Sequence, residues 1–193
     1  MGIEFELKFS ATPEQLEQIA AAYPVAYRTI QMETTYFDTR QFTLSDRHVT
    51  LRRRMENGES VCTVKTPVSG YGRGEWECRC DDIENGVLEL CKLGAPRELL
   101  LLTAEGVAPV CGARFTRRAG DVFCAGAELE LALDQGILLG GGKEIGLCEV
   151  EVELKSGDTA AAIAFGTTLA ERFDLKPQKK SKFRRALALA RGE

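Results

Sequence analysis

The chain has 193 residues and a net charge of −4, with 44% hydrophobic and 28% charged residues. This composition is typical of a soluble globular protein, and we expect residues 1–193 to form one domain without a membrane-spanning segment. The acidic balance argues against a general nucleic-acid binder. The N-terminus lacks a basic region followed by an apolar one, so we expect a cytoplasmic protein.

The first predicted element is a strand over residues 2–9, in which apolar and charged side chains alternate. Successive side chains of a strand point to opposite faces, so the apolar residues share one face and Glu4, Glu6 and Lys8 share the other. Two carboxylates two residues apart on one face repel each other unless a cation lies between them. The segment therefore predicts one apolar face and one face suited to binding ions.

The chain up to residue 110 predicts a helix, antiparallel strands and a helical cover. Thr12, Pro13 and Gln15 give a capping box with proline in the first turn, which predicts a helix start. The expected strands are residues 29–37, 49–55 and 60–66. Asn57-Gly58 is a strong signal for the hairpin turn between the last two. The expected covering helices are residues 87–93 and 96–102.

The remaining chain predicts further strands and two helices. The expected strands are residues 113–118, 122–125, 127–134 and 149–155. A long helix is expected after the last strand, and a short one from about Ala186. Gly142-Lys143 invites comparison with a phosphate-binding loop, but Ile137 and Glu144 stand where that loop needs Gly and Ser or Thr. We therefore interpret the segment as a hairpin loop.

The cysteines indicate neither a zinc site nor a disulfide framework. They are Cys62, Cys78, Cys80, Cys91, Cys111, Cys124 and Cys148. Their number is odd, and they lack the paired spacing of zinc ligands. In a reducing compartment we expect them to be small buried hydrophobes with free thiols.

The charged alternation of the first strand recurs later, with one sign dominating each strand. The acidic rows are Glu75, Glu77, Glu149, Glu151 and Glu153, and the basic rows are Arg52, Arg54 and Lys65. Two assemblies fit: charged faces solvated around a packed apolar centre, or charged faces turned inward with helices over an apolar outside. The amphipathic helices and the like-charge pairs favour the second. We predict an α+β fold, a closed eight-stranded antiparallel β-barrel with a charged interior and helices covering the outside.

A charged interior of this kind has to be wet and filled with ions, because burying unpaired charges is costly. Hard divalent cations prefer carboxylate oxygens, whereas arginine and lysine bind phosphate oxygens. The pattern therefore predicts Mg2+ or Mn2+ together with a polyanion, an arrangement suited to phosphoryl transfer.

A series of short motifs follows in order along nearly the whole chain. The motifs are Glu4-x-Glu6-x-Lys8, Tyr36-Phe37-Asp38-Thr39, Leu51-Arg52-x-Arg54, Thr63-x-Lys65, Glu75-x-Glu77, Leu133-Asp134-Gln135-Gly136, Glu149-x-Glu151-x-Glu153 and Ser181-Lys182. They resemble the signature series of the CYTH superfamily, also called triphosphate tunnel metalloenzymes, and are most similar to bacterial inorganic triphosphatases. The resemblance implies a hydrolase that cleaves tripolyphosphate to pyrophosphate and phosphate with magnesium or manganese. Alternatives are a thiamine triphosphatase, an adenylate cyclase, or a non-catalytic module that binds polyphosphate or nucleotide.

The resemblance also implies roles for individual residues. Those implied to bind phosphate are Lys8, Arg52, Arg54, Lys65, Arg117, Lys182 and Arg185. Those implied to bind metal are Glu4, Glu6, Glu75, Glu77, Asp134, Glu149, Glu151 and Glu153. Those expected at the chemical step are Glu4, Glu6, Lys8 and Glu151; a carboxylate would orient or deprotonate the attacking water. We expect no nucleic-acid or membrane partner, and a monomer or homodimer.

Several positions stay open on the sequence alone. Strict alternation favours Arg118 as much as Arg117 for the basic position of its strand. Asp38 either caps a turn or faces the tunnel, and His48 is expected at the surface. Ser181 is expected to make local hydrogen bonds, because the chain offers no histidine to activate it as a nucleophile.

Overall fold

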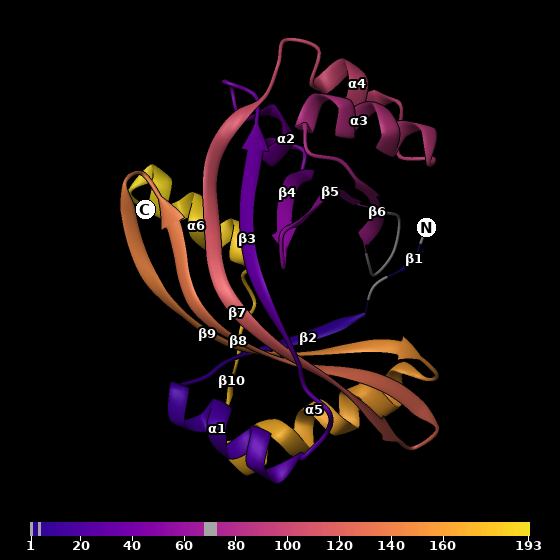
Figure 1. Cartoon of the computed structure of the whole chain (residues 1–193), viewed down its shortest axis with the longest axis vertical. Helices are drawn as coiled ribbons and strands as arrows, with labels where there is room; N and C mark the ends of the chain where they lie inside the picture. The colour runs from indigo at the N-terminus through magenta and orange to yellow at the C-terminus, as the bar shows by residue number, and fades with distance from the viewer. Residues whose placement is uncertain (1, 4, 68–72) are drawn as a thin grey trace.

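The computed structural model describes residues 2–3, 5–67 and 73–193, and of residues 2–3 only the backbone. One strongly curved antiparallel sheet runs through the molecule, and helices pack at both of its ends (Figure 1). The strands are β1 (Gly2–Ile3), β2 (Glu6–Ser10), β3 (Arg28–Asp38), β4 (Thr50–Glu56), β5 (Glu59–Pro67), β6 (Arg73–Arg79), β7 (Ala108–Cys124), β8 (Ala127–Gly140), β9 (Lys143–Ser156) and β10 (Lys176–Pro177). The helices are α1 (Pro13–Ala22), α2 (Thr43–Asp46), α3 (Ile83–Lys92), α4 (Glu98–Leu102), α5 (Thr159–Phe173) and α6 (Lys182–Arg191). Within the described residues, no helix is both long and apolar enough to cross a bilayer.

The strand order is β1-β6-β5-β4-β3-β7-β8-β9-β2-β10, and the pairs are antiparallel. The antiparallel α+β prediction is confirmed. The expectation of a closed eight-stranded barrel is wrong, because among the described residues this order has two ends and ten hydrogen-bonded segments, of which β1 and β10 have two residues each. The N-terminal stretch reaches both edges: β1 pairs with β6 at one edge, β2 pairs with β9 near the other, and Phe5 between them belongs to no strand.

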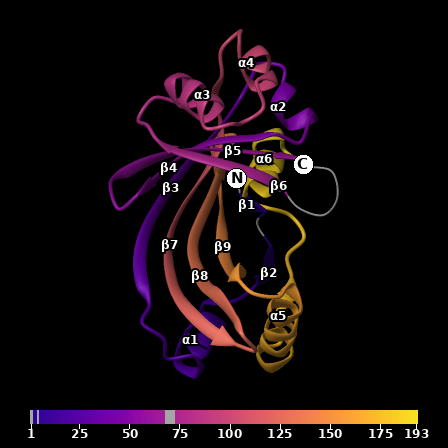
Figure 2. The same ribbon diagram turned by 90° about the vertical axis from the view of Figure 1, so that its right-hand side faces the viewer.

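The long strands β7, β8 and β9 form the back of the molecule and curve over most of its length (Figure 2). The sequence predicted two separate strands where β7 is continuous over 17 residues. The strand is continuous because β8 pairs with it from Cys111 to Cys124. Gly120 leaves room for the Val25 side chain, from which a Cβ would lie only 2.4 Å away. The β8–β9 turn at Gly141 and Gly142, both with positive φ, confirms the predicted hairpin loop.

Two apolar cores lie on the outer face of the sheet. At one end α1 and α5 cover β2, β8 and β9, and Leu16, Ile19 and Leu169 of these helices are fully buried against the strands. The predicted capping box of α1 is present, with the Thr12 and Gln15 side chains each bonded to the other's backbone N–H. Fully burying a large apolar side chain contributes about 1.5–3 kcal/mol, so these helices hold the apolar face outward.

At the other end, α2, α3 and α4 cover the outer face of β4, β5 and β6. Leu51 and Val64 of the strands pack against Leu90 and Leu99 of α3 and α4, and all four are buried. Helices therefore cover the apolar outside at both ends, and the prediction that charged faces turn inward is confirmed.

The last helix, α6, lies against the inner face of the sheet rather than its outside, so the expectation for this helix is wrong. It contacts β7 and β8 and buries Ala186 against Leu138 and Phe115, which point inward. The close approach depends on Gly140, where a Cβ would lie 2.4 Å from the Ala186 carbonyl oxygen. The helix also begins earlier than expected, at Lys182, with Ser181 as its N-cap.

Candidate functional site

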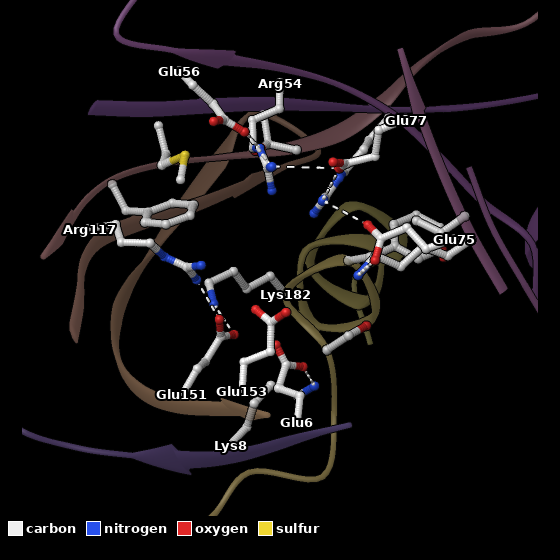
Figure 3. A pocket seen from close by; sticks show the side chains of 18 of the residues that line it. Glu6, Lys8, Arg54, Glu56, Glu75, Glu77, Arg117, Glu151, Glu153 and Lys182 are labelled. Carbon is white, nitrogen blue, oxygen red and sulfur yellow. Dashed lines mark hydrogen bonds and ion pairs between the residues drawn. The ribbon is translucent and has the colours of Figure 1, made fainter. Parts of the chain in front are cut away.

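The concave face of the sheet encloses a cavity of about 360 Å³ whose wall is mostly charged (Figure 3). Among the described residues, the wall has eight basic and seven acidic side chains. The basic ones are Lys8, Arg52, Arg54, Lys65, Arg73, Arg117, Lys155 and Lys182, and the acidic ones are Glu6, Glu56, Glu75, Glu77, Glu130, Glu151 and Glu153. Met32, Phe115 and Phe183 make part of the wall apolar.

One side of the cavity is a basic wall built by β4 and β5. Arg52 and Arg54 point inward because they are two residues apart on β4, and Lys65 points inward from β5. Their cations lie within ion-pair distance of β6 carboxylates: Lys65 Nζ is 3.2 Å from Glu75, and Arg52 and Arg54 are each 3.7 Å from Glu77. Burial lowers the pKa of Arg54, and the positive charge of Arg52 lowers it further. A bound anion would offset the repulsion between the positive charges of Arg52 and Arg54.

The opposite side is an acidic wall built by β2, β8 and β9. Glu6, Glu153 and Glu130 lie in one row across the three strands, because Glu6 and Glu130 are both register partners of Glu153. Two of the three strands also carry a cation: Lys8 of β2 pairs with Glu6, and Lys155 Nζ of β9 lies 2.9 Å from Glu153. Burial alone would lower the Lys8 pKa, but the carboxylates of Glu6, Glu151 and Glu149 together outweigh burial and raise it. Lys8 is therefore held as a cation.

The structure distinguishes Arg117 from Arg118. Arg117 points inward and forms a bidentate pair with Asp134, with N–O distances of 2.8 and 2.7 Å, and also contacts Glu151. Arg118 points to the outer face, where its guanidinium donates to Glu17 of α1 at 2.8 and 3.1 Å. Of the two, Arg117 occupies the cavity wall.

Asp134 and Glu149 lie behind the cavity wall, where they form an ion cluster with residues of α6. Their side chains are 0% exposed and do not line the cavity. Lys182 Nζ lies 2.8 Å from Asp134, 3.3 Å from Glu149 and 2.6 Å from Glu151. Arg185 donates to the other oxygen of Glu149. The predicted cations Lys182 and Arg185 thus contact carboxylates that were predicted to bind metal.

The cluster shifts the pKa values of its members in different directions. Burial opposes ionisation of Glu151, but Lys182 and Arg117 outweigh burial and hold its pKa well below the usual range. Burial likewise opposes the charge of Lys182, but the carboxylates around it raise its pKa. Glu149 has a raised pKa, because burial and the neighbouring Glu151 outweigh its two cations. Lys182 and Glu151 are therefore firmly charged.

The residues predicted to bind a divalent cation differ in how well they fit one. Among the described residues, no three Asp, Glu, His or Cys side chains are gathered tightly enough to hold a metal by themselves. Mg2+, however, commonly uses one or two protein carboxylates and takes its other ligands from water and substrate phosphates. The neighbouring pair Glu6 and Glu153 on the cavity wall fits that requirement. Glu4, predicted beside them, lies outside the described residues.

The structure also shows what the residues do whose roles the sequence left undecided. Asp38 is buried and accepts from the backbone N–H groups of Thr39, Leu44 and Ser45 at 2.8–3.0 Å, so it caps the turn and α2. The other open position, His48, is exposed, as predicted. Ser181 caps α6, which confirms its local role. All seven cysteines are free.

Sequence reasoning missed four charged residues of the cavity wall. These are Glu56, Arg73, Glu130 and Lys155. Each lies two or four residues from a predicted site residue on the same strand, so the alternation that identified Arg54, Glu75, Asp134 and Glu153 applies to them as well. Extending each charged row to the end of its strand would have found them.

A family model described as the CYTH domain matches residues 2–187. The chain belongs to the CYTH family. The predicted resemblance is thereby confirmed, and the cavity is the charged interior of a CYTH fold.

Two curated relatives and one solved structure are similar to this CYTH chain. It is 28% identical over 194 residues to an inorganic triphosphatase of Haemophilus influenzae, with 96% of this chain and 54% of the relative covered. It is 36% identical over 66 residues to a triphosphatase candidate of Bacillus subtilis, YjbK, with 34% and 35% covered. The chain thus spans about half or less of the length of these relatives. An adenylyl cyclase candidate from Hippeastrum with a dominant triphosphatase activity shares the fold, with a TM-score of 0.61, 18% identity, and 100% and 96% of the two chains covered.

Proposed function

We propose that this CYTH chain is a phosphoanhydride hydrolase that cleaves inorganic triphosphate to pyrophosphate and phosphate with Mg2+ or Mn2+. The observation that carries the proposal is the cavity wall, where a basic side faces an acidic side across a space of about 360 Å³. The basic side suits phosphate oxygens, and the acidic side suits the divalent cations that accompany them. The name of the Haemophilus influenzae relative supports inorganic triphosphate as the substrate.

Phosphate binding falls to the cations of the cavity wall. Arg52, Arg54 and Lys65 form the basic side, Lys8 reaches the cavity from the acidic side, and Arg117 reaches it from β7. Arginine can bind phosphate through two parallel N–H groups, whereas lysine acts as a point charge. Together they would hold the chain of phosphates and stabilise the charge that develops on the transferred phosphoryl group.

Metal binding falls to Glu6 and Glu153, and Glu4, two residues before Glu6 in the sequence, is a further predicted ligand. A divalent cation bound there would neutralise charge on the phosphate oxygens. Glu151 is a poor proton acceptor, because Lys182 and Arg117 hold its pKa well below the usual range. Its proposed role is to orient the attacking water. Glu75 and Glu77 of β6 lie within ion-pair distance of Arg52 and Lys65 on the same side of the cavity and would keep the basic side ordered before substrate arrives.

The test is phosphate release from tripolyphosphate, thiamine triphosphate and ATP, each with and without Mg2+ or Mn2+. We expect hydrolysis of tripolyphosphate to exceed that of the other two and to stop when the metal is chelated. A preference for thiamine triphosphate, or formation of cyclic AMP from ATP, would replace the proposed substrate. If all three compounds survive with both metals, the proposed enzyme activity is wrong, and tripolyphosphate binding without turnover would point to a binding module.

A further inference from the structure

The ion cluster behind the cavity wall involves carboxylates that the proposed reaction does not need. We infer that Asp134 and Glu149, together with Lys182 and Arg185, form an ion lock that holds α6 inside the curved sheet, and that these two carboxylates do not bind the divalent cation. Lys182 and Arg185 are then positioning residues for the end wall of the cavity. The statement about the cation rests on the proposed function; the statement about α6 does not.

The first support is that the four carboxylate oxygens of Asp134 and Glu149 each face a cation of the protein. Asp134 receives Nε and Nη2 of Arg117 at 2.8 and 2.7 Å and Nζ of Lys182 at 2.8 Å. One oxygen of Glu149 receives Arg185, and the other lies 3.3 Å from Lys182 Nζ. A metal ion at this place would have to displace a buried cation, which would be left without a counter-charge.

The second support is that positive and negative charges balance within this largely buried cluster. Three carboxylates, those of Asp134, Glu149 and Glu151, meet the three cations of Arg117, Lys182 and Arg185. An additional divalent cation would leave this group with two surplus positive charges among side chains that are at most 18% exposed. The acidic side of the cavity differs, because Lys8 and Lys155 are partly exposed and can exchange one partner for another.

The third support is the position of α6 itself. Its first turn forms part of the cavity wall, with Ser181 and Phe183 among the lining residues, and the Phe183 ring lies 5.0 Å from the ring of Tyr36. Lys182 comes from the same turn, and Arg185 lies three residues further on the same face of the helix. Anchoring these two cations therefore fixes the end wall.

Hydrogen exchange of the metal-free, substrate-free chain tests the lock. Asp134→Asn and Arg185→Gln each remove one charge of the lock, and we expect amides of α6 to exchange about tenfold faster or more in both. Amides of α1 and α5, which pack on the opposite face, should keep their rates. Asp134→Glu keeps the charge and should restore part of the protection, which loss of packing alone would not explain. Unchanged exchange in α6 in both charge-removing variants would overturn the lock.

Binding of Mn2+, followed by electron paramagnetic resonance of the free ion, tests the second half. Glu153→Gln and Glu149→Gln remove the same charge four residues apart on one strand, so each controls for the other. We expect Glu153→Gln to weaken Mn2+ binding by about tenfold or more, and Glu149→Gln to leave the affinity within about twofold of the parent. Weaker binding in Glu149→Gln than in Glu153→Gln would overturn the inference.

The two measurements separate this inference from the proposed function. Hydrogen exchange needs neither metal nor substrate, so the lock can be established in a protein that hydrolyses nothing. If Asp134→Asn does not fold, Arg185→Gln carries the test, because Arg185 is partly exposed and its loss leaves Asp134 paired with Arg117. If tripolyphosphate is hydrolysed but α6 exchange is unchanged in every charge-removing variant that folds, the function stands and the lock fails.

Discussion

Strand β9 presents the same residue type to two different environments. Glu149, Glu151 and Glu153 alternate on one face of this strand, and their side chains are 0%, 9% and 28% exposed. Glu153 lies on the wet cavity wall beside Lys155, whereas Glu149 lies in the closed cluster under α6. The comparison teaches that an alternating row of charges identifies the inner face, but the element packed against that face decides what each charge does.

The largest effect on activity is expected from removing a cation of the cavity wall. Arg52→Ala should lower kcat/KM for tripolyphosphate by about 100-fold or more, because it removes a charge that faces the developing charge on phosphate. Arg118→Ala is the matched control, since Arg118 points to the outer face and pairs with Glu17. Phosphate release under steady-state conditions measures both. Equal losses in the two variants would mean that the concave face is not the site.

A large effect on stability is expected from removing a cation of the ion cluster under α6. Lys182→Met leaves Asp134, Glu149 and Glu151 with one cation fewer in a buried cluster, and we expect a loss of about 3–5 kcal/mol in the free energy of unfolding. The control is Lys176→Met, because Lys176 is exposed and pairs with the exposed Asp174; its effect should stay within about 0.5 kcal/mol. Urea denaturation measures both changes. A small effect in Lys182→Met would contradict the view that the buried charges depend on each other.

Salt should have a smaller effect than these substitutions, and it should affect the cavity wall more than the ion cluster under α6. Raising ionic strength from about 0.05 to 0.5 M shortens the screening distance in water but reaches buried pairs much less. We expect KM for tripolyphosphate to rise several-fold, because charged side chains of the cavity wall such as Lys155 and Glu153 are partly exposed to solvent, while the free energy of unfolding changes little. A fall in stability as large as the change in substrate affinity would show that the cluster under α6 is hydrated too.

The sequence predicted well which face of a strand each side chain points to, but predicted poorly how deeply that side chain is buried. Period-two alternation placed Glu6, Arg52 and Lys65 on the inner face, because that pattern depends only on local backbone geometry. The capping box at Thr12 is local in the same way. Arg117 could not be told from Arg118, because adjacent residues on a strand exchange faces with a shift of one position.

The position of α6 was beyond the sequence. Whether Glu149 is buried depends on a helix more than thirty residues later in the chain, and that helix reaches the inner face only because Gly140 leaves room for Ala186. The pairing of the N-terminal stretch with both β6 and β9 was also beyond the sequence. Both features depend on long-range packing, to which local periodicity is blind.

The most direct test of the whole account is a crystal structure with tripolyphosphate and Mn2+, in which anomalous scattering locates the metal. The account predicts a manganese peak on the cavity wall at Glu6 and Glu153, phosphates against Arg52 and Arg54, and Lys182 still bound to Asp134 and Glu149. A manganese peak at Asp134 and Glu149, with α6 displaced, would contradict it.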